Sequence, residues 1–145
     1  MNLKINFLNQ TKITLSINFK SQIRKIFYSA AAWLKIRSDI EINLIFVNPA
    51  KIKKLNWKFR RENYQTDVLS FKSDIPIKNS IIYADIVICP QIAKKNAIKL
   101  NHSLEKEIII LAVHGFLHIA DFDHSGLFAR KKWDKIFKKL ENIIK

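Results

Sequence analysis

The chain has 145 residues, enough for one globular domain, and its 48% hydrophobic and 11% aromatic content is far above that of a disordered chain. Its single cysteine, Cys89, excludes an internal disulfide, and no apolar run approaches the roughly 20 residues that cross a bilayer. Because the N-terminal stretch also lacks a signal-peptide core, we expect a cytoplasmic protein. A net charge of +14 favours a polyanionic partner such as nucleic acid, although a composition biased towards Lys, Ile and Asn is an alternative source of the charge.

Hydrophobic periodicity predicts alternating strands and helices in the first half of the chain. Apolar and polar residues alternate over 3–7 and again over 40–47, which predicts two half-buried strands. Between them, apolar residues at helical spacing predict an amphipathic helix over 21–35, with Trp33 in the core. Segment 11–17 alternates too weakly to be assigned.

Asn48 and Pro49 mark the start of a second helix, because Asn is a favoured N-cap and Pro loses nothing at the first helical position. Alternation predicts two further strands, at 67–71 and 81–88. Three more helices are predicted, at 90–100, 103–120 and 126–144. Without repeats or a linker, this order predicts one domain over 1–145 of the α+β class, a mixed sheet of about four strands packed against five or so helices.

Three of the four histidines lie in one short stretch, HGFLHIADFDH, at 114–124. His114 and His118 are four residues apart, so both imidazoles lie on one face of a helix, and a turn near Asp121 would return His124 to the same point. Offsets of zero, four and ten are those of the metzincin zinc peptidases. The spacing predicts a site for one divalent transition metal, with zinc as the first choice and nickel or another ion as alternatives.

Gly115 occupies the position where a zinc peptidase has its general-base Glu, so the chain has the metal ligands of a peptidase without its proton acceptor. A glycine within a helix costs about 1 kcal/mol relative to alanine. We therefore expect another group to approach the backbone of Gly115 closely. The alternative for the histidines is that His114 and His118 form an ordinary stripe on an apolar helix and His124 lies in a surface loop.

The histidine stretch resembles the signature of the YbeY-type bacterial rRNA maturation endoribonucleases, His-Gly-x-Leu-His-Leu-x-Gly-Tyr-Asp-His. Two further blocks resemble the same family in the same order, LNWKFRRENYQTDVLSF at 55–71 and ADIVIC at 84–89. The chain departs from the pattern where Asp121 and Ala84 replace Gly and where Gln65 replaces Pro.

The resemblance implies a mixed four-stranded sheet and a three-histidine metal site. It also implies a single-strand-specific endoribonuclease that processes the 3′ end of 16S rRNA and takes part in ribosome quality control. The implied partners are ribosomal RNA and the small ribosomal subunit, and no DNA or membrane is expected. Arg60 matches the family's Arg, and its planar fork suits a phosphate, although a helix-ending surface residue is the alternative. Asp123 is a candidate acceptor for a ligand imidazole N–H.

Other assignments remain open on the sequence alone. Asp85 is interpreted as a structural carboxylate at a strand end, with orienting a ligand or pairing with Arg60 as alternatives. Trp57 is interpreted as a surface on which a base stacks. Two other functions fit the same residues. One is a non-enzymatic RNA- or ribosome-binding assembly factor with a structural metal, and the other is a zinc hydrolase of a non-RNA substrate, against which the missing Glu argues.

Overall fold

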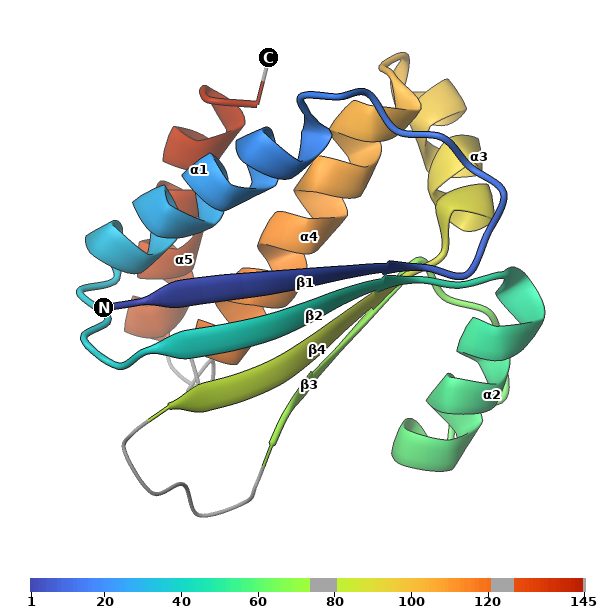
Figure 1. Ribbon diagram of the computed structural model, residues 1–145, viewed down its shortest axis with the longest axis horizontal. Helices are drawn as coiled ribbons and strands as arrows, with labels where there is room; N and C mark the ends of the chain where they lie inside the picture. Colours follow the sequence, from blue (N-terminus) through green and yellow to red (C-terminus); the bar gives the residue numbers. More distant parts are fainter. Residues whose placement is uncertain (74–80, 121–126, 145) are drawn as a thin grey trace.

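The computed structural model describes residues 1–73, 81–120 and 127–144, with backbone alone at 127–130. Four strands form the sheet (Figure 1): β1 Leu3–Asn9, β2 Ile40–Phe46, β3 Val68–Lys72 and β4 Ile82–Ile88. Five helices accompany them in the described residues: α1 Phe19–Trp33, α2 Pro49–Arg60, α3 Pro90–Leu100, α4 Leu104–Ala120 and α5 Leu127–Glu141.

The strands lie in the order β1-β2-β4-β3, and only the β3–β4 pair is antiparallel. Ile42 is paired with Ile5 of β1 and with Ala84 of β4, so these three apolar residues share one face at the centre of the sheet. The single antiparallel edge strand makes the sheet mixed. The α+β architecture expected from the sequence is therefore confirmed.

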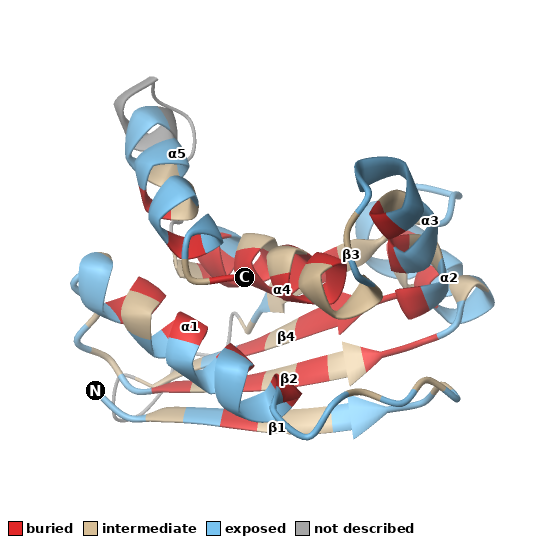
Figure 2. Cartoon of the chain, turned by 90° about the horizontal axis from the view of Figure 1, so that it is seen from above, coloured by how far each residue is buried: buried red, intermediate tan, exposed pale blue. Residues whose placement is uncertain are grey.

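The helices cover the two faces of the sheet unequally. Helices α1, α4 and α5 lie on one face, and α2 lies on the other (Figure 1). The larger core forms on the first face, where the rings of Phe27 and Phe116 stack with centroids 4.6 Å apart. A smaller cluster that includes Ile52, Leu69 and Cys89 forms beneath α2. Figure 2 shows buried residues concentrated on α4 and the central strands, while α2 and α5 are largely exposed.

The ends of the helices follow the expected local chemistry. The side chain of Asn48 accepts a hydrogen bond from the backbone N–H of Lys51 at 2.9 Å, and Pro49 occupies the first turn, so the predicted N-cap is confirmed. Arg61 ends α2 in the left-handed conformation, with φ of 57°. Segment 11–17 has no helix or strand.

One core assignment was wrong. Trp33 is 36% exposed, and the ammonium of Lys139 lies 5.5 Å from the centre of its ring. The reason is that α1 ends at Trp33, so this ring lies at the rim of the helix rather than beneath it. Within the part of the chain that the structure describes, no helix is both long and apolar enough to cross a membrane.

Candidate active site

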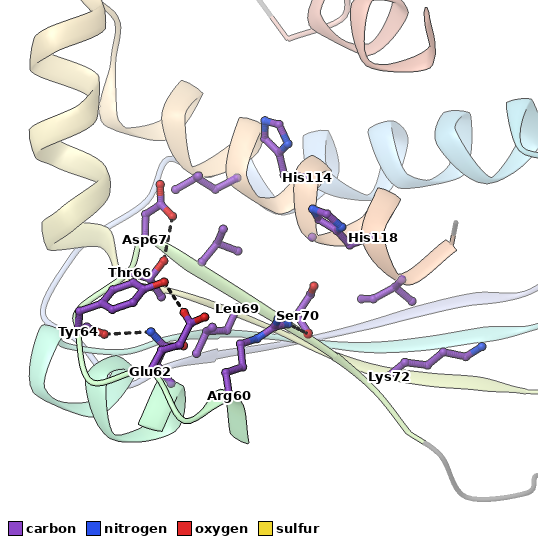
Figure 3. Close-up of a pocket in the computed structure, with 15 residues that line it drawn as sticks. Arg60, Glu62, Tyr64, Thr66, Asp67, Leu69, Ser70, Lys72, His114 and His118 are labelled. Carbon is purple, nitrogen blue, oxygen red and sulfur yellow. Dashed lines mark hydrogen bonds between the residues drawn. The ribbon is translucent and has the colours of Figure 1, made fainter. Parts of the chain in front are cut away.

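A cleft of about 640 Å³ separates α4 from the segment that joins α2 to β3 and from β3 itself. His114 and His118 of α4 line one side of it, and Arg60 at the end of α2 lines the other (Figure 3). The structure thus brings together three of the predicted site residues. The fold achieves this because α4 packs against edge strand β3, and the segment that follows Arg60 leads directly into that strand.

The two imidazoles rest against aromatic rings of α5. The centroid of the His114 ring lies 5.3 Å from the centroid of the Trp133 ring and 4.4 Å from that of Phe137. The centroid of the His118 ring lies 5.6 Å from that of Trp133. Burial lowers the pKa of His114 from its ordinary value, against the opposing charges of Asp67, Glu107 and Glu141. A lowered pKa keeps this imidazole neutral near pH 7, which is the form that binds a metal.

Two of the three predicted metal ligands lie within the described residues. His114 and His118 are nitrogen donors one helical turn apart that line the same cleft, as two ligands of a transition metal must. His124 lies outside the described residues, as do Asp121 and Asp123. In residues 1–73, 81–120 and 127–144 no group of three His, Cys, Asp or Glu is placed to hold a metal. The two donors fit a metal site, and its third ligand stays a prediction.

Gly115 packs directly on the sheet. A Cβ at this position would lie 2.8 Å from Cγ2 of Ile86 and 3.2 Å from its Cγ1, both on the central strand β4. The expected close approach at Gly115 is therefore confirmed. The absence of a side chain lets this turn of α4, with a histidine one residue before it and another three residues after it, sit against the strand.

Arg60 is held in place by groups of β3. Its Nη2 donates a hydrogen bond to the carbonyl oxygen of Ser70 at 3.0 Å, and its guanidinium carbon lies 5.7 Å from the centre of the Phe71 ring. The centroid of the Phe71 ring lies 5.0 Å from the centroid of the Phe59 ring. One of five guanidinium N–H donors is used in the bond to Ser70, which leaves others for a ligand in the cleft.

The segment after Arg60 contributes groups that sequence reasoning missed. Glu62 and Tyr64 line the cleft, and the Tyr64 hydroxyl donates a hydrogen bond to the Glu62 carboxylate (Figure 3). This bond raises the pKa of Tyr64. Buried Asn56 shapes the segment by donating from Nδ2 to the carbonyl oxygen of Tyr64 at 3.0 Å. A tyrosine within a polar run just after the candidate arginine was the available signal.

Of the other polar residues considered in the sequence, Asp67 lines the cleft, whereas Asp85 and His102 do not. Asp67 lines the cleft, where its Oδ2 accepts a hydrogen bond from Asn96 at 3.1 Å. Asp85 accepts a hydrogen bond from Asn43 at 2.9 Å across the β2–β4 pair, so the considered pairing with Arg60 is wrong. His102 lies in the loop after α3, where its Nε2 is 2.5 Å from Oε2 of buried Glu107. It does not line the cleft.

The fold and cleft define a class: α+β proteins in which a helix crossing a mixed sheet presents histidines opposite an arginine. The family model described as Endoribonuclease YbeY matches residues 4–145. The Endoribonuclease YbeY of Phytoplasma mali is 38% identical over 144 residues, covering 96% of this chain and 90% of that protein. The Mycoplasma capricolum protein of the same name is 35% identical over 151 aligned positions, covering 98% and 91%.

A solved structure agrees with these relatives. The solution structure of TM1509 from Thermotoga maritima is similar with a TM-score of 0.55 and 27% identity, over 95% of this chain and 89% of that one. The chain belongs to the YbeY family of endoribonucleases.

Proposed function

We propose that this chain is a metal-dependent endoribonuclease that cleaves single-stranded RNA in the cleft between α4 and the α2–β3 segment. Family membership supports the RNA-cleaving activity. The observation in this structure that carries the proposal is that Arg60 and the imidazoles of His114 and His118, distant in sequence, line one cleft. Phosphoryl chemistry needs positive charge where charge builds on the phosphate, and this cleft provides it.

Arg60 is the proposed phosphate-binding residue. Its guanidinium presents paired N–H donors in a plane that matches two phosphate oxygens. The bond to Ser70 and the contact with Phe71 restrict its motion before substrate binds. A preorganised donor loses less conformational freedom at the moment of reaction than a free surface arginine.

The proposed metal is one divalent transition ion, with zinc first, held by His114, His118 and His124. When bound, such an ion supplies Lewis-acid polarisation of a phosphoryl oxygen. The burial that lowers the pKa of His114 keeps its nitrogen lone pair available. Asp123 is the proposed acceptor for a ligand imidazole N–H, which would fix the orientation of that ring.

The proposed substrate is ribosomal RNA, with processing of the 3′ end of 16S rRNA and quality control of the small ribosomal subunit as the biological role. The net charge of +14 supports a polyanionic substrate. A cytoplasmic site of action, where ribosomal subunits mature, belongs to the same proposal.

The test is cleavage of a labelled single-stranded RNA by highly purified protein with measured metal content. Arg60→Ala should abolish cleavage while metal content and melting temperature stay near those of the wild type, and Arg60→Lys should recover little because an ammonium lacks the planar fork. Arg37→Ala, which removes an exposed arginine that does not line the cleft, is the matched control.

A second comparison tests the metal site. His118→Ala should lose both bound metal and cleavage, whereas His102→Gln, outside the cleft, should retain metal. A matched peptide substrate should remain intact. Cleavage of RNA that continues at the wild-type rate in both Arg60→Ala and His118→Ala would show that the activity belongs to a contaminant and would refute the proposal.

A further inference from the structure

The end of α2 and the segment after it form an unusually exposed aromatic surface beside the cleft. Every residue from 57 to 65 is exposed. Among them, Trp57 is 50% exposed and Tyr64 is 54% exposed, although both carry large apolar rings. Large aromatic side chains that are left exposed next to a cleft are typical of a binding surface, because their burial against a partner is favourable.

Helical geometry places these rings on either side of Arg60. Asn56 and Arg60, four residues apart, form the stripe of α2 that lines the cleft. Trp57 is three residues before Arg60 and therefore its neighbour on the helix surface. Tyr64 lines the cleft itself, beyond the end of the helix. We call Trp57, Arg60, Arg61 and Tyr64 the aromatic rim.

The rim combines rings with positive charge. The guanidinium carbon of Arg61 lies 5.6 Å from the centre of the Trp57 ring. The guanidinium carbon of Arg60 lies 5.7 Å from the centre of the Phe71 ring on β3. Arg61 holds this position because it ends the helix in the left-handed conformation. A partner for such a surface must offer flat rings and negative charge together, which is the chemistry of an unpaired nucleic-acid strand.

We propose that the aromatic rim binds nucleotides that flank the phosphate held by Arg60, with one base stacked on Trp57 and another on Tyr64. This inference rests on the proposed function and specifies how that site holds its substrate. Bases in a duplex are already stacked on one another, so only a single strand can present a base face to Trp57. The rim therefore gives a physical reason for a preference for single-stranded RNA.

The experiment separates stacking from charge by varying protein and ligand together. Binding is measured by fluorescence anisotropy, with chelator present so that cleavage does not interfere, for a single-stranded RNA and for a strand of the same length without bases. Trp57→Ala should weaken binding of the RNA roughly tenfold and leave binding of the abasic strand unchanged. Trp57→Phe should retain most of the affinity, because it keeps a ring.

Trp33→Ala is the matched control, since Trp33 is also an exposed tryptophan with a cation near its ring but lies at the end of α1 and not beside Arg60. It should bind both strands like the wild type. Tyr64→Ala provides a second variant at the rim and should also weaken binding of the RNA alone. A duplex of the same sequence should show no dependence on Trp57.

The outcomes distinguish this inference from the proposed function. Equal loss of affinity for the RNA and the abasic strand in Trp57→Ala, or no loss for either, would overturn the stacking role even if cleavage is intact. Base-dependent binding through Trp57 without any cleavage by the metal-loaded protein would support the rim and refute the nuclease. Circular dichroism and melting temperature of each variant establish that the comparison is made between folded proteins.

Discussion

At the scale of single residues, Gly115 controls how closely α4 approaches the sheet. Its position faces Ile86 of β4 so directly that a Cβ would lie 2.8 Å from a methyl carbon. The helix that carries both candidate metal ligands is therefore seated on the central part of the sheet by the absence of a side chain. The unfavourable helix propensity of glycine, about 1 kcal/mol, is offset by this packing.

We expect Gly115→Ala to lower the free energy of unfolding by about 1–3 kcal/mol through overpacking, less the gain of about 1 kcal/mol in helix propensity. The close atoms Cγ2 and Cγ1 are bonded directly to Cβ of Ile86, so they are not the far end of a flexible side chain and cannot give way cheaply. Chemical denaturation measures the effect. Ile86→Ala in the same chain should reduce the cost of Gly115→Ala, and additive effects of the two changes would contradict a direct clash.

His114 should make the stability of the metal-free protein depend on pH. Burial lowers its pKa in the folded state from the ordinary 6.5. Below pH 6.5 the unfolded chain then binds more protons than the folded chain, so stability should fall as the pH falls through this value and then level off below the folded pKa.

The measurement compares urea unfolding at pH 7.5 and pH 5.5 after removal of metal with a chelator. His114→Phe keeps an aromatic ring against Trp133 and Phe137 but cannot titrate. The variant should lose less stability than the wild type over this interval. An identical loss in both proteins would show that other groups cause the acid dependence.

At the scale of elements, α2 is the helix whose placement decides where Arg60 lies. It packs on the opposite face of the sheet from α4, and Ile52 and Asn56 are its only buried residues. Its start is fixed by the Asn48 cap, and its end by the left-handed Arg61 and by the bond from Arg60 to Ser70. A helix with so little burial depends strongly on its ends.

Asn48→Ala should therefore lower stability by about 1 kcal/mol, because it leaves the Lys51 N–H without its acceptor. Asn48→Asp, which keeps a capping oxygen, should stay close to the wild type. Thermal melting of the two variants side by side measures the cap. If Asn48→Ala melts like Asn48→Asp, the cap contributes nothing and the ends of α2 are held by other contacts.

At the scale of the whole molecule, the charge of +14 should dominate the strength of RNA binding. Each phosphate neutralised on a single strand releases counterions, so affinity should fall with salt, with a logarithmic slope of about −0.7 for each phosphate contact. Arg60→Ala should make this slope shallower by roughly 0.7, because it removes one such contact. Trp57→Ala should leave the slope unchanged while lowering affinity at every salt concentration. Titrations of an uncleaved strand from low to moderate salt would test both, and a Trp57→Ala slope altered as much as that of Arg60→Ala would contradict the separation of stacking from charge.

Local patterns in the sequence were sufficient for most of the fold. Alternation and helical spacing are set by neighbouring residues, so the four strands and five helices were predicted within a few residues of their ends. The cap at Asn48 and the close approach at Gly115 were predictable for the same reason, because each depends on conformational properties of one residue type. The order β1-β2-β4-β3 was not, since it depends on which distant strands pair.

The sequence by itself was enough to predict which residues belong to the candidate site: His114 and His118 through their helical spacing, and Arg60 through its matching motif. Only the tertiary structure decided that they share one cleft, because α4 and the end of α2 both pack on edge strand β3, on either side of that cleft. The same packing placed Asp85 on Asn43 rather than on Arg60, and left Trp57 exposed beside the cleft. Spacing along a helix is a local property of the chain, whereas a cleft between distant segments exists only once the sheet has brought them together.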